Sequence, residues 1–350
     1  MMPHAGQIRA AQEGAQEGAQ DGAREGAGAP PPASAPAVAP GPGVGTAMAG
    51  RQRLILHIGT HKTASSTLQA LMAHNRAALA ARGVCYPRTD RPPFPQHPKH
   101  NSLYAALNGG PAQTRAEIDL LLHEFRASGA HTLVLSAEGL STLPAAAVAG
   151  LAPLTAGFAT EVVCFLRRPD RFVESLWNQR CKTGREQRHI DDFLRRPRVR
   201  ALLDYPAMLD AWAGVGRVTA LGFEATSAAG LVAGFNAATG LALPAEEGRR
   251  RNVSPGMRCA AIMAGLQRRG IVADWRTVEA GLEGEDTRHA LGARLRAEIL
   301  EGCAAQAEDL ARRYGVRFPD DLPEEPDAPL PRPRAAELDR IAARLPAVSG

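Results

Sequence analysis

Residues 54–72 read Leu-Ile-Leu-His-Ile-Gly-Thr-His-Lys-Thr-Ala-Ser-Ser-Thr-Leu-Gln-Ala-Leu-Met, a strand pattern that passes through a short turn into a helix pattern. The turn places Lys62 and several hydroxyl side chains at the N-terminus of the predicted helix. Backbone N–H groups converge there, and the helix dipole adds to their attraction for an anion. The stretch therefore predicts a loop that binds a phosphate-like group, although an ordinary helix capped by serine or threonine has a similar pattern.

The order of residues in this turn differs from that of nucleoside-triphosphate loops, G-x-x-x-x-G-K-[ST]. Lys62 comes before the hydroxyl cluster, and no Gly-Lys pair precedes a serine or threonine. The run from Lys62 to Thr67, Lys-Thr-Ala-Ser-Ser-Thr, resembles instead the 5′-phosphosulfate loop of sulfotransferases, which usually reads Lys-x-Gly-Thr-Thr or Lys-Thr-Gly-Thr-Ser. Those enzymes use 3′-phosphoadenosine 5′-phosphosulfate (PAPS).

The resemblance implies a role for each part of the loop. Lys62 is expected beside the 5′-phosphate and the bridging oxygen, with Ser65, Ser66 and Thr67 donating to phosphate oxygens. Ala64 stands where the family usually has glycine, and a Cβ penalises a positive φ, so we expect an adjusted turn or weaker cofactor binding. The expected cofactor loop comprises Gly59, His61, Lys62, Thr63, Ala64, Ser65, Ser66 and Thr67.

A second strand and helix follow at residues 161–180. Residues 161–166 are apolar and rich in β-formers, which predicts a buried strand that ends at Arg167. Pro169 suits the first position of a helix and Asp170 its first turn, so the helix is predicted to start just after the arginine pair. Ser175 then lies about two turns into the helix.

The spacing of Arg167 and Ser175 is similar to the 3′-phosphate signature of sulfotransferases, in which a serine follows a strand-ending arginine by eight positions. Arginine offers a planar fork of donors for a phosphate, and serine adds a neutral hydroxyl. Taken alone, Arg167 and Ser175 would also be explained as a solvated basic strand end and a serine on a helix surface. Because both signatures occur in the family's order, the resemblance implies that this pair recognises the 3′-phosphate of PAPS.

Further segments resemble the bacterial sulfotransferase-like branch, and the resemblance covers about residues 51–318. They are the opening His57–Thr63, the Ser136-Ala137-Glu138 segment and an Asn-x-Ser element at Asn252. A late basic segment closes over the 3′-phosphate in this family, which makes Arg250 and Arg251 candidate lid residues, although an arginine run beside a Pro-Gly turn also suits a solvated loop.

Sulfuryl transfer sets the remaining requirements of the site. Negative charge develops on the bridging oxygen, where Lys62 is placed to stabilise it, and the acceptor must lose a proton to a general base. Glu138, after the third apolar strand, and His100, in a proline-rich loop, are both candidates for that base. Without a catalytic role, Glu138 would be a carboxylate that interacts with N–H groups at a helix start, and His100 would be a solvent-facing loop histidine. His57, within an apolar strand, is interpreted as a core histidine.

The chain is predicted to have three parts. Residues 1–50 are expected to be disordered, residues 51–318 to form an α/β domain, and residues 319–350 to be an acidic, proline-rich tail with a weak helix at 335–345. The domain is expected to have a doubly wound, mostly parallel sheet flanked by helices, a P-loop-like sulfotransferase fold with a largely helical C-terminal part. Strands are predicted at 84–86, 133–136, 162–166 and 217–223, and helices at 68–82, 116–128, 205–212, 231–238, 257–269 and 286–313.

Composition argues against several other classes of protein. The five cysteines are dispersed, and neither they nor the histidines show a metal-ligand spacing, so we expect reduced thiols and no metal. The net charge of +5 comes from scattered arginines with only 5% aromatic residues, which does not suggest nucleic-acid binding. No apolar run is long enough to span a membrane, which favours a cytoplasmic enzyme.

Together these patterns predict a PAPS-dependent sulfotransferase that acts on a hydroxyl or amine of a small molecule, glycan or lipid-linked acceptor. Two alternatives stay open. One is a nucleotide kinase of the P-loop type, and the other is a degenerate member of the family that binds a nucleotide without catalysis. The sequence indicates neither the acceptor nor the oligomeric state.

Overall fold

The computed structural model describes residues 52–88, 98–245, 255–284, 286–320 and 328–345. All of them belong to one unit, residues 48–350. The predicted disordered segment at 1–50 and the candidate lid residues Arg250 and Arg251 therefore lie outside the described residues, and so does part of the acidic tail.

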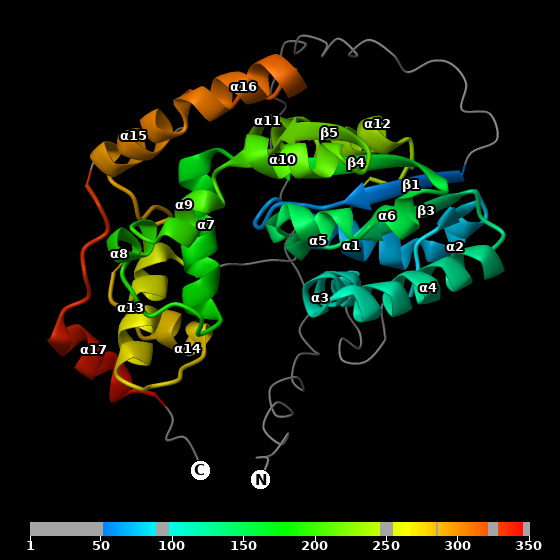
Figure 1. The fold of residues 1–350 in the computed structure, drawn as a ribbon. Coiled ribbons are helices and arrows are strands. Elements are labelled where there is room, and N and C mark those ends of the chain that lie inside the picture. The colour runs from blue at the N-terminus through cyan, green and yellow to red at the C-terminus, as the bar shows by residue number, and fades with distance from the viewer. Residues whose placement is uncertain (1–51, 89–97, 246–254, 285, 321–327, 346–350) are drawn as a thin grey trace, which may run out of the picture. The chain divides into compact units, whose positions relative to one another are not determined.

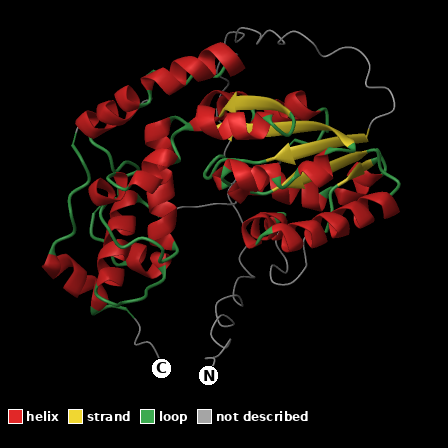
Figure 2. Ribbon diagram, viewed as in Figure 1, coloured by secondary structure: helices red, strands yellow, loops and turns green. Residues whose placement is uncertain are grey.

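Five parallel strands form a single sheet in the described residues, in the order β2-β3-β1-β4-β5 (Figures 1 and 2). The central strand β1 (Gln52–His57) pairs with β3 (Thr132–Ser136) on one side and with β4 (Phe158–Leu166) on the other. The edge strands are β2 (Val84–Cys85), beside β3, and β5 (Arg217–Gly222), beside β4. The predicted α/β class with a parallel sheet is confirmed.

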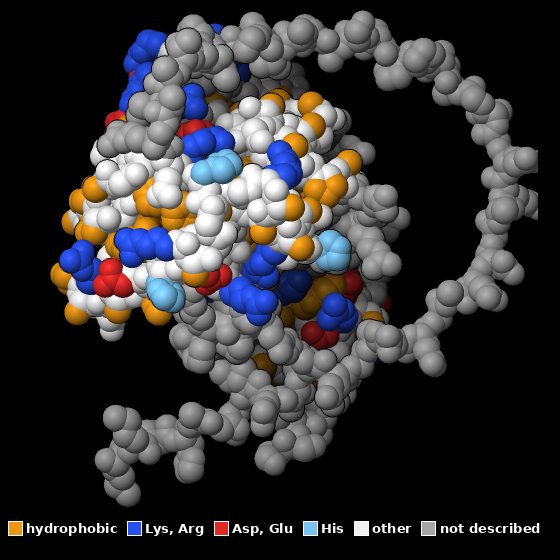
Figure 3. Space-filling view, turned by 90° about the vertical axis from the view of Figure 1, so that its right-hand side faces the viewer, with side chains coloured by type: hydrophobic (Ala, Val, Ile, Leu, Met, Phe, Trp, Pro, Cys, Tyr) orange, Lys and Arg blue, Asp and Glu red, His pale blue; other side chains and the backbone are white. Residues whose placement is uncertain are grey.

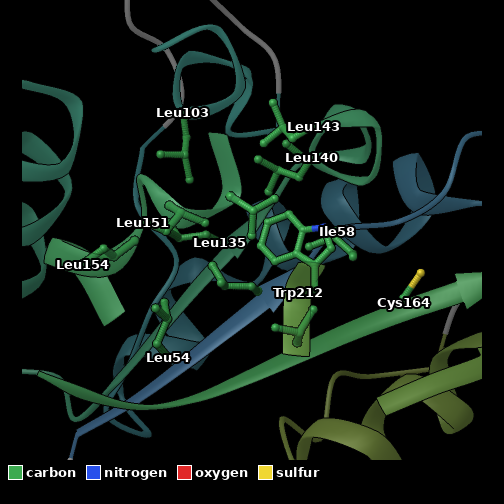
Figure 4. Close-up of a cluster of buried hydrophobic side chains, with 14 of the residues drawn as sticks. Leu54, Ile58, Leu103, Leu135, Leu140, Leu143, Leu151, Leu154, Cys164 and Trp212 are labelled. Carbon is green, nitrogen blue, oxygen red and sulfur yellow. The ribbon is translucent and has the colours of Figure 1, made fainter. Parts of the chain in front are cut away.

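Side chains of β1 alternate between two cores because successive residues of a strand point to opposite faces. Leu54 and Leu56 pack on one face with Trp212, in the cluster of leucines that Figure 4 shows. Ile55 packs on the other face with Leu68 and other apolar residues. Helices therefore cover both faces of the sheet, as expected for a doubly wound arrangement.

The first face is covered by α3 (Asn101–Gly109), α4 (Pro111–Ala127), α5 (Ala145–Ala149), α6 (Ala152–Thr155), α10 (Tyr205–Ala213) and α16 (Ala304–Tyr314). The second is covered by α1 (Ser65–His74), α2 (Arg76–Ala80) and α12 (Leu231–Thr239). Two short helices, η1 (Glu138–Thr142) and α11 (Phe223–Ala229), follow strands β3 and β5.

A third, helical core contains the apolar face of α7 (Pro169–Lys182), which was predicted from Phe172, Val173, Leu176 and Trp177. It packs against α13 (Met257–Arg268) and α15 (Ala293–Gly302). The other helices of this part are α8 (Ile190–Leu194), α9 (Pro197–Ala201), α14 (Trp275–Ala280) and α17 (Ala335–Ala342). The largely helical C-terminal part thus has apolar contacts of its own.

Two predicted helices are wrong in their extent. The helix expected at 68–82 is two helices, because Asn75 adopts a non-helical backbone and its side chain bonds the carbonyl of Leu71 at 2.8 Å. The helix expected at 286–313 begins only at Ala293 and is interrupted at Cys303. Asp286 lies outside it because its carboxylate accepts from the N–H groups of Arg258 and Cys259, at the start of α13.

The strand order creates a crevice between the carboxyl ends of β1 and β4. The connection from β1 leads to β2, on the β3 side of the sheet, whereas the connection from β4 leads to β5, on the opposite side. Ligands of open α/β sheets bind where neighbouring strands diverge in this way. The loop after β1 and the arginine after β4 are the two predicted cofactor elements, and they flank this point.

Candidate functional site

The loop after β1 has an unusual backbone. Gly59, Lys62 and Ala64 have φ values of 65°, 68° and 55°, in the left-handed region. Ala64 is the residue that precedes α1, and its φ and ψ of 55° and 23° are those that a glycine adopts most easily. The expected adjustment of the turn is therefore not seen: alanine adopts the left-handed conformation that favours glycine.

Steric strain of this kind has a cost. A left-handed backbone costs a residue with a Cβ roughly 1–2 kcal/mol. Apart from Lys62 and Ala64, Ala242 is the other non-glycine residue with a positive φ in the described part of the chain. Strained backbone persists where the surrounding structure enforces it, and it is frequent at binding sites.

Hydrogen bonds hold the loop against β4. The hydroxyl of Thr60 donates to the carbonyl of Phe165 at 2.9 Å, and the thiol of Cys164 donates to the carbonyl of Gly59 at 2.9 Å. Gly59 leaves no room for a side chain, because an added Cβ would lie 2.8 Å from Oγ of Ser65 and 3.1 Å from Cα of Glu138. The loop is thus fixed between β4 and the end of β3.

Arg167 connects the two predicted cofactor elements. Its Nη1 donates to Oγ of Ser175 at 3.0 Å, and the same nitrogen donates to the carbonyl oxygen of Lys62 at 3.0 Å. Glu224, which the sequence analysis did not identify, lies 3.7 Å from its Nε. Two residues that were paired only by their spacing are therefore in contact, and both are next to the loop after β1.

Lys62 is half-buried beside α7. Its ammonium contacts Oε1 of Gln179 at 3.4 Å, and Gln179 lies one turn after Ser175 on the same face of the helix. Burial lowers the pKa of Lys62, and the charges of Arg167 and Lys182 lower it further, against the opposing effect of Glu138. Among the described side chains, the ammonium of Lys62 contacts an amide and no carboxylate, so its charge is available to a bound anion.

The chain contains only three lysines among its 41 lysine and arginine residues, and two of them, Lys62 and Lys99, contact residues of this site. Lys99 forms an ion pair with Glu138 at 2.9 Å. Lys182 is close enough to Lys62 to affect its pKa. This convergence was missed in the sequence analysis, and the rarity of lysine in an arginine-rich chain was the available signal.

Glu138 and His61 lie near each other in the electrostatic field of these cations. Burial raises the pKa of Glu138, but Lys99, His61 and Lys62 outweigh it, so the pKa falls below its ordinary value. Burial lowers the pKa of His61, and Glu138 only partly opposes this effect. At neutral pH the pair therefore consists of a carboxylate and a neutral imidazole.

The structure places the other candidate base, His100, in the interior. Its Nδ1 accepts a hydrogen bond from the backbone N–H of Ser136 at 3.0 Å, and its ring packs edge-on against Tyr86. Only 1% of its surface is exposed, so the solvent-facing alternative is wrong as well. Because the ring is buried and Nδ1 already accepts a backbone hydrogen bond, His100 is poorly placed to take a proton from an acceptor.

His57 is a core histidine, as its position in an apolar strand predicted. It is fully buried beside Phe165 and Phe235, and its Nδ1 lies 2.8 Å from Oγ of Ser136. That hydroxyl also accepts from the side-chain amide of Gln69 at 3.0 Å. Burial lowers the pKa of His57 to about 4, so the ring is neutral at physiological pH.

A buried ion cluster fixes the start of α7, and it was not found from the sequence. Arg168 binds both carboxylate oxygens of Asp170, at 2.7 and 2.8 Å. Arg296 of α15 contacts the same carboxylate and bonds Glu174 at 3.2 Å. These side chains are at most 5% exposed, and they anchor the helix that carries Ser175 and Gln179.

Basic residues elsewhere are arranged differently. On the face shown in Figure 3, Lys and Arg side chains lie in several places among acidic and histidine side chains and do not form one continuous band. Arg53 and Arg217, at the amino ends of β1 and β5, both pair with Glu161, at 3.0 and 3.4 Å. A cavity of about 540 Å³ beside α15 and α16 is lined by Arg168 but by none of the predicted site residues.

Comparisons with known proteins give no assignment: no protein-family model matches the chain, and no curated protein matches it significantly. None of the described helices is long and apolar enough to cross a membrane. In the described residues there is also no group of three or more histidine, cysteine or acidic side chains that could hold a metal ion.

Proposed function

We propose that the protein is a sulfotransferase that uses PAPS and transfers its sulfuryl group to an acceptor hydroxyl or amine. The observation that carries the proposal is the 3.0 Å contact between Arg167 and Ser175, with the same guanidinium bonded to the backbone of Lys62. The resemblance of the two motifs to those of sulfotransferases predicts that Arg167 and Ser175 bind the same phosphate. The two side chains are in contact, beside the crevice where open α/β sheets bind ligands. This agreement supports the assignment.

The residues present are suited to the two anionic ends of such a nucleotide. The loop 59–67 leads into α1, and no side chain caps the N-terminus of that helix. The N–H of Thr67 donates to the carbonyl of Ala64 at 2.9 Å, so the N–H groups of Ser65 and Ser66 are the ones available to a phosphate. Arg167 and Ser175 would hold the 3′-phosphate through charge-assisted hydrogen bonds. The nucleotide supplies an activated sulfuryl group on a phosphate leaving group. The protein positions the two substrates and stabilises the negative charge that develops in the transfer.

Lys62 would stabilise the charge that develops on the leaving oxygen. Electrostatic stabilisation of that kind is strongest in a site from which water is partly excluded, and Lys62 is half-buried. The backbone bond from Arg167 and the side-chain contact to Gln179 hold the lysine in place. As the sulfur–oxygen bond to the leaving phosphate breaks and the bond to the acceptor forms, the acceptor proton passes to a base.

Glu138 is favoured as that base, because it is ionised and lies at the end of β3 next to Gly59. The burial of His100, together with the backbone bond at its Nδ1, argues against the alternative. Lys99 would hold the Glu138 carboxylate in its orientation through their ion pair. The lowered pKa makes Glu138 a weak base, so it is suited to an acceptor that loses its proton late in the transfer.

The test is calorimetric binding of 3′,5′-adenosine diphosphate, the nucleotide product, compared with 5′-AMP and Mg·ATP. We expect a preference for the 3′-phosphorylated nucleotide in the wild-type chain and its loss in Arg167→Ala and Ser175→Ala. Lys62→Ala is expected to abolish sulfuryl transfer while the far-UV circular dichroism stays unchanged. Arg198→Ala, on α9, is a matched control because this arginine is exposed and lies outside the site.

Equal or tighter binding of Mg·ATP would move the protein to the kinase alternative. Binding of none of the three nucleotides would favour a non-catalytic member. If Lys62→Ala and Arg167→Ala both keep full activity and affinity, the assignment of the two loops is wrong.

A further inference from the structure

Arg180 stands apart from the other arginines that are removed from solvent. It is half-buried in the last turn of α7, yet its guanidinium has no hydrogen bond or ion pair among the described residues. Every other buried or half-buried arginine in the described ranges has at least one such partner. These are Arg53, Arg76, Arg167, Arg168, Arg171, Arg196, Arg258, Arg296 and Arg340.

The guanidinium nitrogens of Arg180 are not among the buried atoms that lack a hydrogen-bond partner, so they are accessible to water and to a dissolved anion. The dipole of α7 favours a cation near its C-terminus and so accounts for a basic residue at this position. It does not account for the burial, since a fully exposed arginine would interact with the dipole as well. Among the described residues no anion pairs with Arg180, so its charge is available to a bound anion.

The position of Arg180 relates it to the proposed active site. The preceding residue, Gln179, contacts the ammonium of Lys62 at 3.4 Å, so this turn of α7 lies against the loop after β1. Burial is the main cause of the lowered pKa of His61, and Arg180 is among the cations that contribute to it. Arg180 is thus within electrostatic reach of His61.

The anions of this region already have partners. Glu138 is paired with Lys99 at 2.9 Å, and Glu224 lies 3.7 Å from Arg167 and accepts from the backbone of Arg168. In the proposed function the phosphates of the nucleotide are bound by the loop after β1 and by Arg167 with Ser175. The charge of Arg180 then remains for the other substrate.

We infer that Arg180 forms an anion subsite beside the loop after β1, and that it receives an acidic group of the acceptor. This inference rests on the proposed function. The acceptor class is a hydroxyl or amine compound that also carries a carboxylate, phosphate ester or sulfate group. A planar guanidinium binds such groups through two parallel hydrogen bonds, which orients the acceptor as well as attracting it. A neutral acceptor would leave Arg180 without a partner and is selected against.

The test uses inorganic sulfate as the probe, titrated calorimetrically into the full-length chain with saturating 3′,5′-adenosine diphosphate present. We expect one sulfate to bind, and we expect Arg180→Gln to weaken its binding about tenfold, the effect of losing a charge-assisted hydrogen bond. Arg198→Gln removes the same charge from an exposed site on α9 and is expected to leave sulfate binding unchanged. Arg180→Met is a second charge-removing variant, and thermal melting establishes that each variant is folded.

Two further titrations separate this inference from the proposed function. Affinities for 3′,5′-adenosine diphosphate and for PAPS are expected to be the same in wild type and Arg180→Gln. If Arg180→Gln weakens PAPS alone, Arg180 holds the sulfuryl group of the donor and the acceptor assignment is overturned. Absence of sulfate binding in the wild type, or equal binding in the wild type and both Arg180 variants, also overturns it. Failure of the wild type to bind 3′,5′-adenosine diphosphate refutes the proposed function instead, and the nucleotide-free sulfate titration of the same variants still decides the role of Arg180.

Discussion

Replacing Ala64 by glycine should stabilise this protein, in contrast to most alanine-to-glycine changes. Ala64 has a φ of 55°, where its Cβ crowds the backbone at a cost of roughly 1–2 kcal/mol. Glycine removes that cost but adds roughly 0.5–1 kcal/mol of conformational entropy to the unfolded chain. The difference is a net gain of about 0.5–1 kcal/mol in the free energy of unfolding.

Urea denaturation followed by circular dichroism measures this change as a shift of the midpoint at constant slope. Ala70→Gly is the matched control, since Ala70 lies within α1, where glycine costs about 1 kcal/mol relative to alanine. The two variants have the same chemistry and lie in the same segment, and we expect changes of opposite sign. If both lower the midpoint by similar amounts, Ala64 does not adopt the left-handed conformation and the account of this loop is wrong.

The same variant also tests whether the loop is functional. Because Ala64 already adopts the backbone conformation that favours glycine, a competent enzyme should bind 3′,5′-adenosine diphosphate with nearly the same affinity after the change. A large gain in affinity would indicate that alanine had impaired an ancestral site, in agreement with the non-catalytic alternative. Stability and affinity thus answer separate questions with one protein.

Two other predictions concern buried ionisable side chains. The pKa of His57 is lowered to about 4 by burial, so the unfolded chain binds more protons than the folded chain between pH 6.5 and 4, and stability must fall as the pH falls through this range. The loss from His57 alone should reach about 2 kcal/mol at pH 5, and urea denaturation of His57→Asn between pH 7 and 5 should give a shallower pH dependence than the wild type; equal dependence would contradict the assignment. Asp170→Asn should cost about 3–5 kcal/mol in the free energy of unfolding because it leaves the buried charges of Arg168 and Arg296 without a full partner. Asp192→Asn breaks a partly exposed pair with Arg332 and should cost less than about 1 kcal/mol, and equal losses in the two variants would refute the importance of burial.

The sheet could be predicted from the sequence because its strands are short apolar runs separated by helix patterns. Alternation of this kind requires parallel pairing, and the central strands were predicted within a few residues of their ends. The helix boundaries at Asn75 and Asp286 could not be predicted with the same rules. Both depend on hydrogen bonds of a side chain, to Leu71 within the same turn and to the distant start of α13, respectively. Local propensity does not determine which of these bonds will form.

The candidate site divides in the same way. Arg167 and Ser175 could be paired because their spacing resembles a family signature, and the two side chains are in contact at 3.0 Å. The place of His100 could not be predicted, because its Nδ1 is occupied by the backbone of a strand 36 residues away. The cluster of Arg168, Asp170 and Arg296 likewise joins segments far apart in the chain.

Arg180 illustrates the limit most clearly. Every charged residue can be read from the sequence, and the cations are in excess. The sequence does not indicate which cation has no anionic partner in the described part of the chain. That property depends on which side chains are close in space. In a chain with many arginines, charge by itself is therefore weak evidence of a binding site. A half-buried guanidinium beside a proposed site, with no partner among the described residues, is stronger evidence, because its charge is open to a ligand.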